Sequence, residues 1–212
     1  MLIYAVADIH GKKSHFKTIR KNIDRYNPDF LVIAGDITRR FRYRKPLTKL
    51  NELKVPVLAV LGNSDWNFIH KIMDHKSNIT NLNLRNYTGI DFSFTGISGT
   101  IPLPLNNIVS FNERKKFEQI AEFMNKDTIL VAHPPPYGIL DLVFKNYHTG
   151  SKVLREFIEK HQPQLVLCGH IHDQTGRAFI NKTLVVNCAM TKKSAGAIIR
   201  IGKDHMPKVE LV

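Results

Sequence analysis

Two histidines, His170 and His172, follow the apolar run of "QLVLCGHIHD" (residues 164–173) with only one residue between them. If the chain turns at Gly169, where the apolar run stops, both imidazole rings can converge on one point. Imidazole is the commonest metal ligand among protein side chains. The spacing therefore indicates a metal site, provided that other parts of the chain supply further ligands.

Ligand-type residues also follow four other apolar runs of the sequence. Open α/β sheets place their sites at the carboxyl ends of strands, so residues that follow such runs are expected to meet. Singly, Asp36 and Asn63 are also explained as turn formers after glycine. Seven ligand-type residues at five strand ends favour a metal centre instead. The set comprises Asp8, His10, Asp36, Asn63, His133, His170 and His172.

Strand-like and helix-like segments alternate along most of the chain. Apolar runs typical of buried strands cover residues 2–7, 30–35, 56–62, 127–133 and 164–169, and residues 87–97 alternate like a strand pair. Helices are predicted after Ser14 and Ser151, which can act as N-caps, and within residues 43–54 and 111–124. The tail predicts consecutive antiparallel strands at 175–180, 183–190, 195–201 and 208–212. This order predicts an α/β fold with more than one sheet.

Composition limits the class of protein. The chain has 212 residues, 43% of them hydrophobic, which favours one domain over residues 1–212. No apolar run is long enough to span a membrane, and the first residues lack the basic start of a signal peptide. Cys168 and Cys188 lie in apolar runs and indicate buried thiols in a reducing, cytoplasmic setting. The formal charge of +13 indicates either acidic partners or a general solubility surface.

Five short motifs occur in a fixed order along residues 8–172: "DIH", "GD", "GN", "AHPPP" and "GHIH". In type and order they resemble the signature of the calcineurin-like metallophosphoesterases. The resemblance spans most of the chain and implies the family's fold. That fold has two facing mixed β-sheets flanked by helices, a four-layer α-β-β-α sandwich with the site at one edge.

The resemblance also implies how the ligands are divided. Asp8, His10, Asp36 and His172 would hold one divalent ion. Asp36, Asn63, His133 and His170 would hold a second, with Asp36 bridging the two. Such ions lie about 3.5–4 Å apart, and a hydroxide between them attacks the phosphorus. Mixed imidazole and carboxylate ligands suit several metals, of which manganese is favoured over iron, nickel, cobalt and zinc.

One motif departs from the family pattern. Many members carry histidine after the "GN" pair, where it assists the leaving group, but this chain has Ser64. A serine hydroxyl is too weak an acid to protonate a leaving group near neutral pH. His148, in a segment between "HPPPYG" and Ser151, is the candidate replacement, with a surface histidine as the alternative.

A basic segment, "RRFRYRKP" (residues 39–46), begins three residues after Asp36. Arg39, Arg40 and Arg42 are predicted to bind substrate phosphate, and the interleaved aromatic residues suit stacking on a base. The alternative is the basic start of a solvated helix. Trp66, the only tryptophan, either forms a wall of the pocket or fills the core.

The favoured function is hydrolysis of a phosphodiester, or of a phosphomonoester with a good leaving group. Asn63 and His148 are the expected catalytic residues beside the metals. The expected partner is a small phosphorylated substrate such as a nucleotide, and nucleic acid is not favoured. The protein is expected to be a monomer or homodimer without membrane association. The alternatives are a catalytically weak metal-binding scaffold on the same fold and a nuclease.

Overall fold

The first of two large sheets collects strands from both ends of the chain. The computed structural model describes residues 1–39, 42–90, 92–99, 106–144, 146–202 and 205–212. The strand order in this sheet is β14-β13-β1-β2-β3-β4. Strands β1 to β4 are parallel, β13 is antiparallel to β1, and β14 is antiparallel to β13. Their bounds are β1 (Leu2–Val6), β2 (Phe30–Ala34), β3 (Val57–Val60), β4 (Ile79–Asn81), β13 (Ala197–Ile201) and β14 (Pro207–Leu211).

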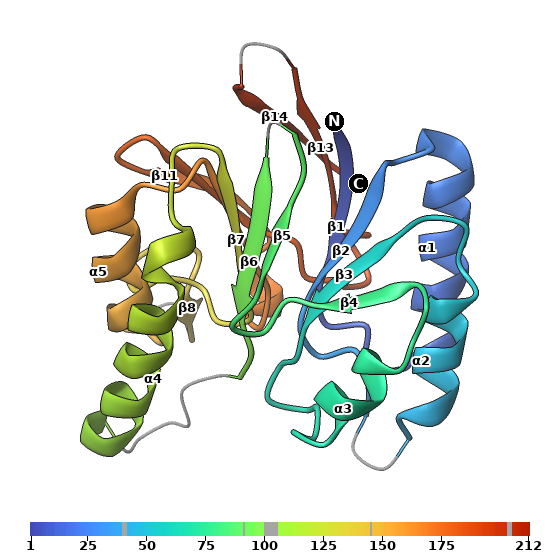
Figure 1. The fold of residues 1–212 in the computed structure, drawn as a ribbon, viewed down its shortest axis with the longest axis horizontal. Helices are drawn as coiled ribbons and strands as arrows, with labels where there is room; N and C mark the ends of the chain where they lie inside the picture. Colours follow the sequence, from blue (N-terminus) through green and yellow to red (C-terminus); the bar gives the residue numbers. More distant parts are fainter. Residues whose placement is uncertain (40–41, 91, 100–105, 145, 203–204) are drawn as a thin grey trace.

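The second sheet has the order β11-β12-β10-β7-β6-β5 and faces the first (Figure 1). Its four central strands are parallel, and its two edge strands are antiparallel to their neighbours. The bounds are β5 (Asn86–Thr88), β6 (Ser93–Ile97), β7 (Thr128–Ala132), β10 (Leu165–Cys168), β11 (Gly176–Ile180) and β12 (Thr183–Asn187).

Helices cover the outer face of each sheet and complete a four-layer sandwich (Figure 1). On the first sheet lie α1 (Lys13–Tyr26) and α2 (Arg44–Asn51), and on the second lie α4 (Asn106–Ile120) and α5 (Lys152–His161). Short elements complete the chain: α3 (Ile69–Asp74), η1 (Ala121–Phe123), η2 (His172–Gln174) and a hairpin of β8 (Leu142–Val143) and β9 (Tyr147–His148). The predicted fold, two facing mixed sheets flanked by helices, is confirmed.

The central strands are apolar on both faces because both faces are covered. In β2, Leu31 and Ile33 pack in the cluster under α1 and α2, while Val32 and Ala34 pack between the two sheets. A continuous apolar run is therefore required here, rather than the alternation of a half-exposed strand. The rigid strand layers hold the loops at their carboxyl ends in fixed positions.

Two details of the predicted elements are wrong. Ser14 is not an N-cap, because α1 starts at Lys13 and the cap position, Lys12, makes no side-chain hydrogen bond. The tail strands are not all consecutive neighbours, since β12 pairs with β10 in the second sheet and β13 pairs with β1 in the first. The other predicted cap is confirmed: the Ser151 hydroxyl accepts a hydrogen bond from the Leu154 amide at 2.9 Å.

Among the helices that the structure describes, none combines the length and the apolar character needed to cross a bilayer.

Candidate metal centre

The backbone turns sharply where the predicted ligands leave their strands. Asp8, His10, Asp36 and His170 all have positive φ, with values of 60°, 49°, 54° and 70°. This left-handed conformation is unfavourable for residues with a Cβ and persists only where the surrounding structure enforces it. Strained backbone conformations are common at functional sites. Here the backbone turns direct side chains from several strands toward one point. The turn predicted beside Gly169 therefore lies at His170 itself.

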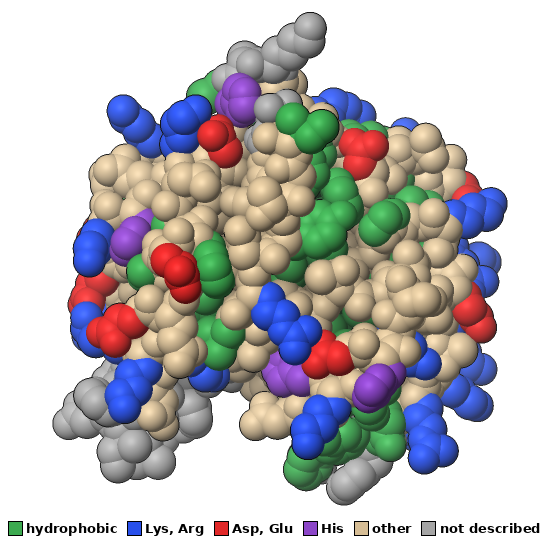
Figure 2. All heavy atoms as spheres, viewed as in Figure 1, with side chains coloured by type: hydrophobic (Ala, Val, Ile, Leu, Met, Phe, Trp, Pro, Cys, Tyr) green, Lys and Arg blue, Asp and Glu red, His purple; other side chains and the backbone are tan. Residues whose placement is uncertain are grey.

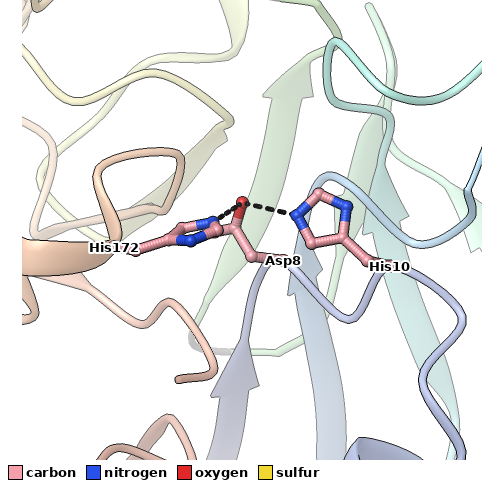
Figure 3. A group of neighbouring side chains, drawn as sticks. All are labelled: Asp8, His10 and His172. Carbon is pink, nitrogen blue, oxygen red and sulfur yellow. Dashed lines mark ion pairs between the residues drawn. The ribbon is translucent and has the colours of Figure 1, made fainter. Parts of the chain in front are cut away.

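Asp8 lies between two imidazole rings in a cluster that we call the open group: Asp8, His10 and His172 (Figure 3). Asp8 Oδ1 is 3.1 Å from His172 Nε2 and 3.8 Å from His10 Nε2. This oxygen is buried and accepts no hydrogen bond, whereas Oδ2 accepts one from the His170 amide at 2.9 Å. A buried carboxylate oxygen without a donor, facing two imidazole nitrogens, fits a divalent cation.

A second cluster, the buried group, consists of Asp8, Asp36 and His133. The two carboxylate oxygens of Asp36 face different histidines. Oδ1 lies 3.6 Å from His133 Nε2, and Oδ2 lies 3.7 Å from His10 Nε2. His133 Nδ1 lies 2.8 Å from the Ala34 carbonyl oxygen. A proton on Nδ1 that is donated to this carbonyl leaves Nε2 free as a ligand, which is the usual arrangement of metal-binding histidines.

The remaining two predicted ligands adjoin the buried group. Asn63 Oδ1 is 3.1 Å from His133 Nε2, and the His170 ring centroid is 5.1 Å from that of His133. The structure thus brings all seven predicted ligands to one edge of the sandwich, at the carboxyl ends of strands from both sheets. Oxygen and imidazole donors of this kind suit transition metals such as manganese and zinc.

The electrostatics of the centre favour the metal-binding forms of His170, His10 and Asp8, but not of His172. Burial lowers the pKa of His170 to about 4, so its ring is neutral at pH 7 and keeps a lone pair for a cation. Burial also lowers the pKa of His10. Burial alone would raise the pKa of Asp8, but His172 and other neighbours outweigh it and the pKa is lowered. The adjacent Asp8 carboxylate in turn raises the pKa of His172.

Ser64 contacts the predicted bridging ligand directly. Its hydroxyl donates to Asp36 Oδ2 at 2.7 Å, and its amide donates to Asp36 Oδ1 at 2.8 Å. The residue that replaces the family's histidine therefore orients the carboxylate of a predicted ligand. Nothing in the sequence alone indicated this contact, because the two residues are 28 positions apart.

Asp65 connects two loops of the site, and the sequence interpretation missed it. Its carboxylate accepts hydrogen bonds from the Ile37, Thr38 and Gly62 amides and from the Thr38 hydroxyl, at 2.7–3.0 Å. It therefore ties the loop after β2, which carries Asp36, to the loop after β3, which carries Asn63. The only available signal was an acidic residue two positions after the "GN" pair.

His148 lies in β9 and pairs with a residue that was also missed, Asp141. The two side chains approach to 2.6 Å between Nδ1 and Oδ1, and Asp141 is 1% exposed. The other Asp141 oxygen accepts from the Gly138 and Gly150 amides at 3.0 Å each, so the carboxylate anchors the loop. Among the described residues, the contacts of His148 are with Asp141 and Tyr137, not with the seven ligands.

A cavity of about 690 Å³ opens over the centre, which we call the metal cavity. Its lining includes His10, Asn63 and Ser64 together with Lys12, Arg39 and Trp66. Arg39 therefore lies at the site as predicted, and Trp66 forms part of a wall. Arg42 lines an adjoining groove. Arg40 lies outside the described residues.

Two facing sheets with a histidine and carboxylate cluster at their shared edge define a metallophosphoesterase fold. Residues 1–174 match the calcineurin-like phosphoesterase family, and the chain belongs to that family.

Relatives and solved structures agree with this assignment. An uncharacterized protein of Methanocaldococcus jannaschii is 33% identical over 199 residues, which is 88% of this chain and 87% of the relative. The structure of TT1561 from Thermus thermophilus has a TM-score of 0.75 at 14% identity, over 99% of this chain and 98% of that one. A dimetal phosphatase from Danio rerio has a TM-score of 0.71 at 10% identity, over 100% and 95%. At such identities the structural matches show the fold.

Proposed function

We propose that the protein is a dinuclear-metal phosphoesterase. The observation that carries the proposal is the position of Asp36, whose two oxygens face His10 and His133 separately. Asp8, His10, Asp36 and His172 would hold one ion, and Asp36, Asn63, His133 and His170 the other. Bound ions would polarise the phosphoryl oxygens and supply a nucleophile from water near neutral pH. Manganese is the favoured metal, with iron, nickel, cobalt or zinc as alternatives.

The substrate would be a phosphodiester, or a phosphomonoester with a good leaving group. Lys12 and Arg39 line the metal cavity and would hold the phosphate charge there. Asn63 contacts His133 and faces the same cavity, so it would orient the phosphoryl group. Ser64 fixes Asp36 and is too weak an acid to protonate a leaving oxygen.

His148 would supply that proton, with Asp141 as its positioning residue. The 2.6 Å contact with a buried carboxylate supports the proposal, because it holds the ring in one orientation. The role also requires the loop over residues 134–150 to approach the leaving group when substrate binds. We further propose that residues 1–212 act as one domain, as a cytoplasmic monomer or homodimer.

The decisive experiment is a panel of aryl phosphomonoesters and phosphodiesters, assayed with Mn²⁺, Ni²⁺, Co²⁺ and Mg²⁺, with metal content measured in parallel. We expect about two transition-metal ions per chain and metal-dependent hydrolysis that is faster for diesters. Absence of bound metal after incubation with Mn²⁺ would contradict the dinuclear site. Two bound ions without hydrolysis of any ester would instead support the scaffold alternative.

The role of His148 is tested by a series of aryl esters that differ in leaving-group pKa. His148→Ala and Asp141→Asn should lower kcat/KM chiefly for poor leaving groups, by about 10²-fold or more. His161→Ala, which removes a histidine from the far end of α5, is the matched control. It should leave the dependence of kcat/KM on leaving-group pKa unchanged. An equal loss for good and poor leaving groups would show that the pair acts only in folding the loop.

A further inference from the structure

A second cavity adjoins the metal cavity, and we call it the basic groove. Its volume is about 830 Å³, and it shares His10, Lys12 and Arg39 with the metal cavity. The two spaces are therefore continuous. Lysine and arginine side chains line the edge of the molecule over α1 and α2 (Figure 2). Seven of the twelve residues that line the groove are basic: Lys12, Lys13, Arg39, Arg42, Arg44, Lys45 and Lys49.

Among the described residues, no acidic side chain lines the groove beside its basic ones. The ion pairs of the described residues involve none of these seven cations. Like charges held close together repel one another, so the groove favours an anion that carries several charges along its length. One phosphate ester at the metal centre would leave most of these cations without a partner.

Aromatic rings line the path between the metal cavity and the basic groove. Trp66 lines the metal cavity and Tyr43 lines the groove, with Phe68 between them. Ring centroids are 5.0 Å apart for Tyr43 and Phe68, and 6.4 Å for Phe68 and Trp66, whose planes differ by 27°. Trp66 and Phe68 are each 45% exposed. Hydrophobic side chains gather on this surface below α3, beside basic ones (Figure 2).

A repeating anion with flat apolar groups matches this surface. Grooves for single-stranded nucleic acid combine a basic track for the backbone with aromatic faces on which unpaired bases stack. Each of the two cavities has the volume of a complete small-ligand site, so together they exceed what one nucleotide fills. Resting on the proposed phosphoesterase function, we propose that the substrate is single-stranded nucleic acid, bound along the basic groove with its scissile phosphodiester in the metal cavity.

The reaction is then hydrolysis within a strand. Water adds at the phosphorus, one P–O ester bond breaks, and the leaving oxygen takes up a proton. The products are one strand that ends in a phosphate monoester and one that ends in a hydroxyl. Arg42, Arg44, Lys45 and Lys49 would pair with phosphates flanking the cleaved bond, and Trp66 and Phe68 would stack on the adjacent bases.

Trp66 provides a direct signal, because it is the only tryptophan in the chain. The fluorescence of Trp66 is measured in EDTA while ligand is added to the protein. The ligands are oligothymidylates from a dinucleotide to roughly eight nucleotides, and inorganic tripolyphosphate. We expect saturable quenching by the oligonucleotides, with affinity that rises with length. Tripolyphosphate should bind more weakly and quench little. A self-complementary duplex that binds more tightly than the single strand would overturn the stacking on unpaired bases.

The basic groove is tested by the triple variant Arg44→Ser, Lys45→Ser and Lys49→Ser. The matched control is Lys21→Ser, Lys160→Ser and Lys182→Ser, which removes the same charge from exposed positions outside both cavities. For single strands, the logarithm of the binding constant falls with the logarithm of salt concentration by about 0.7 for each phosphate contact. The loss of three contacts should therefore reduce this slope by about 2. The groove variant should bind at least tenfold more weakly, and the control should bind almost as wild type does.

Equal weakening in both triple variants would overturn the proposal, since binding would then follow net charge alone. If the groove variant does not fold, Lys13→Ser with Arg42→Ser tests the same groove outside α2. Hydrolysis of aryl esters by the wild type is measured separately. Ester hydrolysis without oligonucleotide binding would overturn only this inference, whereas binding without any metal-dependent hydrolysis would overturn the proposed function.

Discussion

The open group and the buried group share Asp8 but differ in how firmly the protein holds them. The His172 side chain of the open group is 45% exposed, whereas the His133 side chain of the buried group is 0% exposed. His133 is also fixed by the Ala34 carbonyl, while among the described residues His172 contacts only Asp8 and the ring of His10. One half of the centre is therefore set by packing before a cation binds. The other half is more exposed, and its His10 lines the metal cavity.

The largest effect is expected at Asp36, which belongs to the buried group and also faces His10 of the open group. Asp36→Asn removes a charge that faces both His10 and His133, so both ions should bind more weakly. Loss of several kcal/mol of charge stabilisation corresponds to a fall in kcat/KM of roughly 10³-fold. The measurement is metal content and aryl-ester hydrolysis, with Asp24→Asn on the exposed face of α1 as the control. Retention of two ions would show that Asp36 is not the bridge.

Single ligands should separate the two groups. His133→Ala should lower the affinity of the more tightly held ion by about 10²-fold or more. The reason is that water replaces a buried ligand ring only at a cost in free energy. His172→Ala should mainly weaken the other ion, whose exposed position water can occupy. Isothermal titration with Mn²⁺ of the chelated protein resolves the two sites. Identical binding curves for the two variants would contradict the distinction between the groups.

Substitution of two glycines tests the difference in rigidity between the open group and the buried group through the free energy of unfolding. Gly35 has φ 91°, and a Cβ there would press on the His133 ring and lie 2.9 Å from the Gly62 nitrogen. Gly35→Ala should lower the free energy of unfolding by about 2–5 kcal/mol. Gly11, beside the open group, has φ 64° with its nearest contact at 3.3 Å, so Gly11→Ala should cost about 1–2 kcal/mol. Urea unfolding in EDTA measures both, and equal costs would show that the two halves are equally rigid.

The smallest expected effect concerns the hydroxyl that orients Asp36. Ser64→Ala removes a donor to Asp36 Oδ2 but leaves the amide donor to Oδ1 in place. Loss of such a supporting hydrogen bond typically weakens metal binding by about 10–100-fold, and the lower end is expected because one donor remains. Ser14→Ala, at an exposed position in α1, serves as the control. Unchanged Mn²⁺ affinity would show that the hydroxyl contact is not needed for binding.

The sequence predicted the strand layers and all seven candidate ligands because both leave local signals. Buried parallel strands need continuous apolar runs, and ligand types stood directly after them. Asp65 and Asp141 were not predicted, because each accepts hydrogen bonds from backbone amides in loops. No pattern of side chains in the sequence shows where such amides lie. Of the basic groove, the sequence indicated the segment 39–46, but not Lys12 and Lys13, which reach it from the turn after β1, nor Lys49 of α2.

Partner choice among strands was also beyond local patterns. Residues 183–201 give similar apolar runs, so nothing in them says that β12 belongs to one sheet and β13 to the other. The parallel pairing of β12 with β10 and the crossing near Ala189 arise from the competition of all strands for neighbours. The preference for an antiparallel tail was correct within each pair, β11 with β12 and β13 with β14.

The pairing of β1 with β13 has a consequence for biosynthesis. Leu2 lies opposite Arg200, so one edge of the strand that precedes Asp8 receives its neighbour only after the residues up to β13 have been made. Contacts so distant in sequence slow folding, and until they form, an apolar strand edge is open to pairing with other nascent chains. The first sheet therefore has a late step in its assembly. Chaperones that shield this strand edge until β13 is available should therefore raise the yield of folded protein.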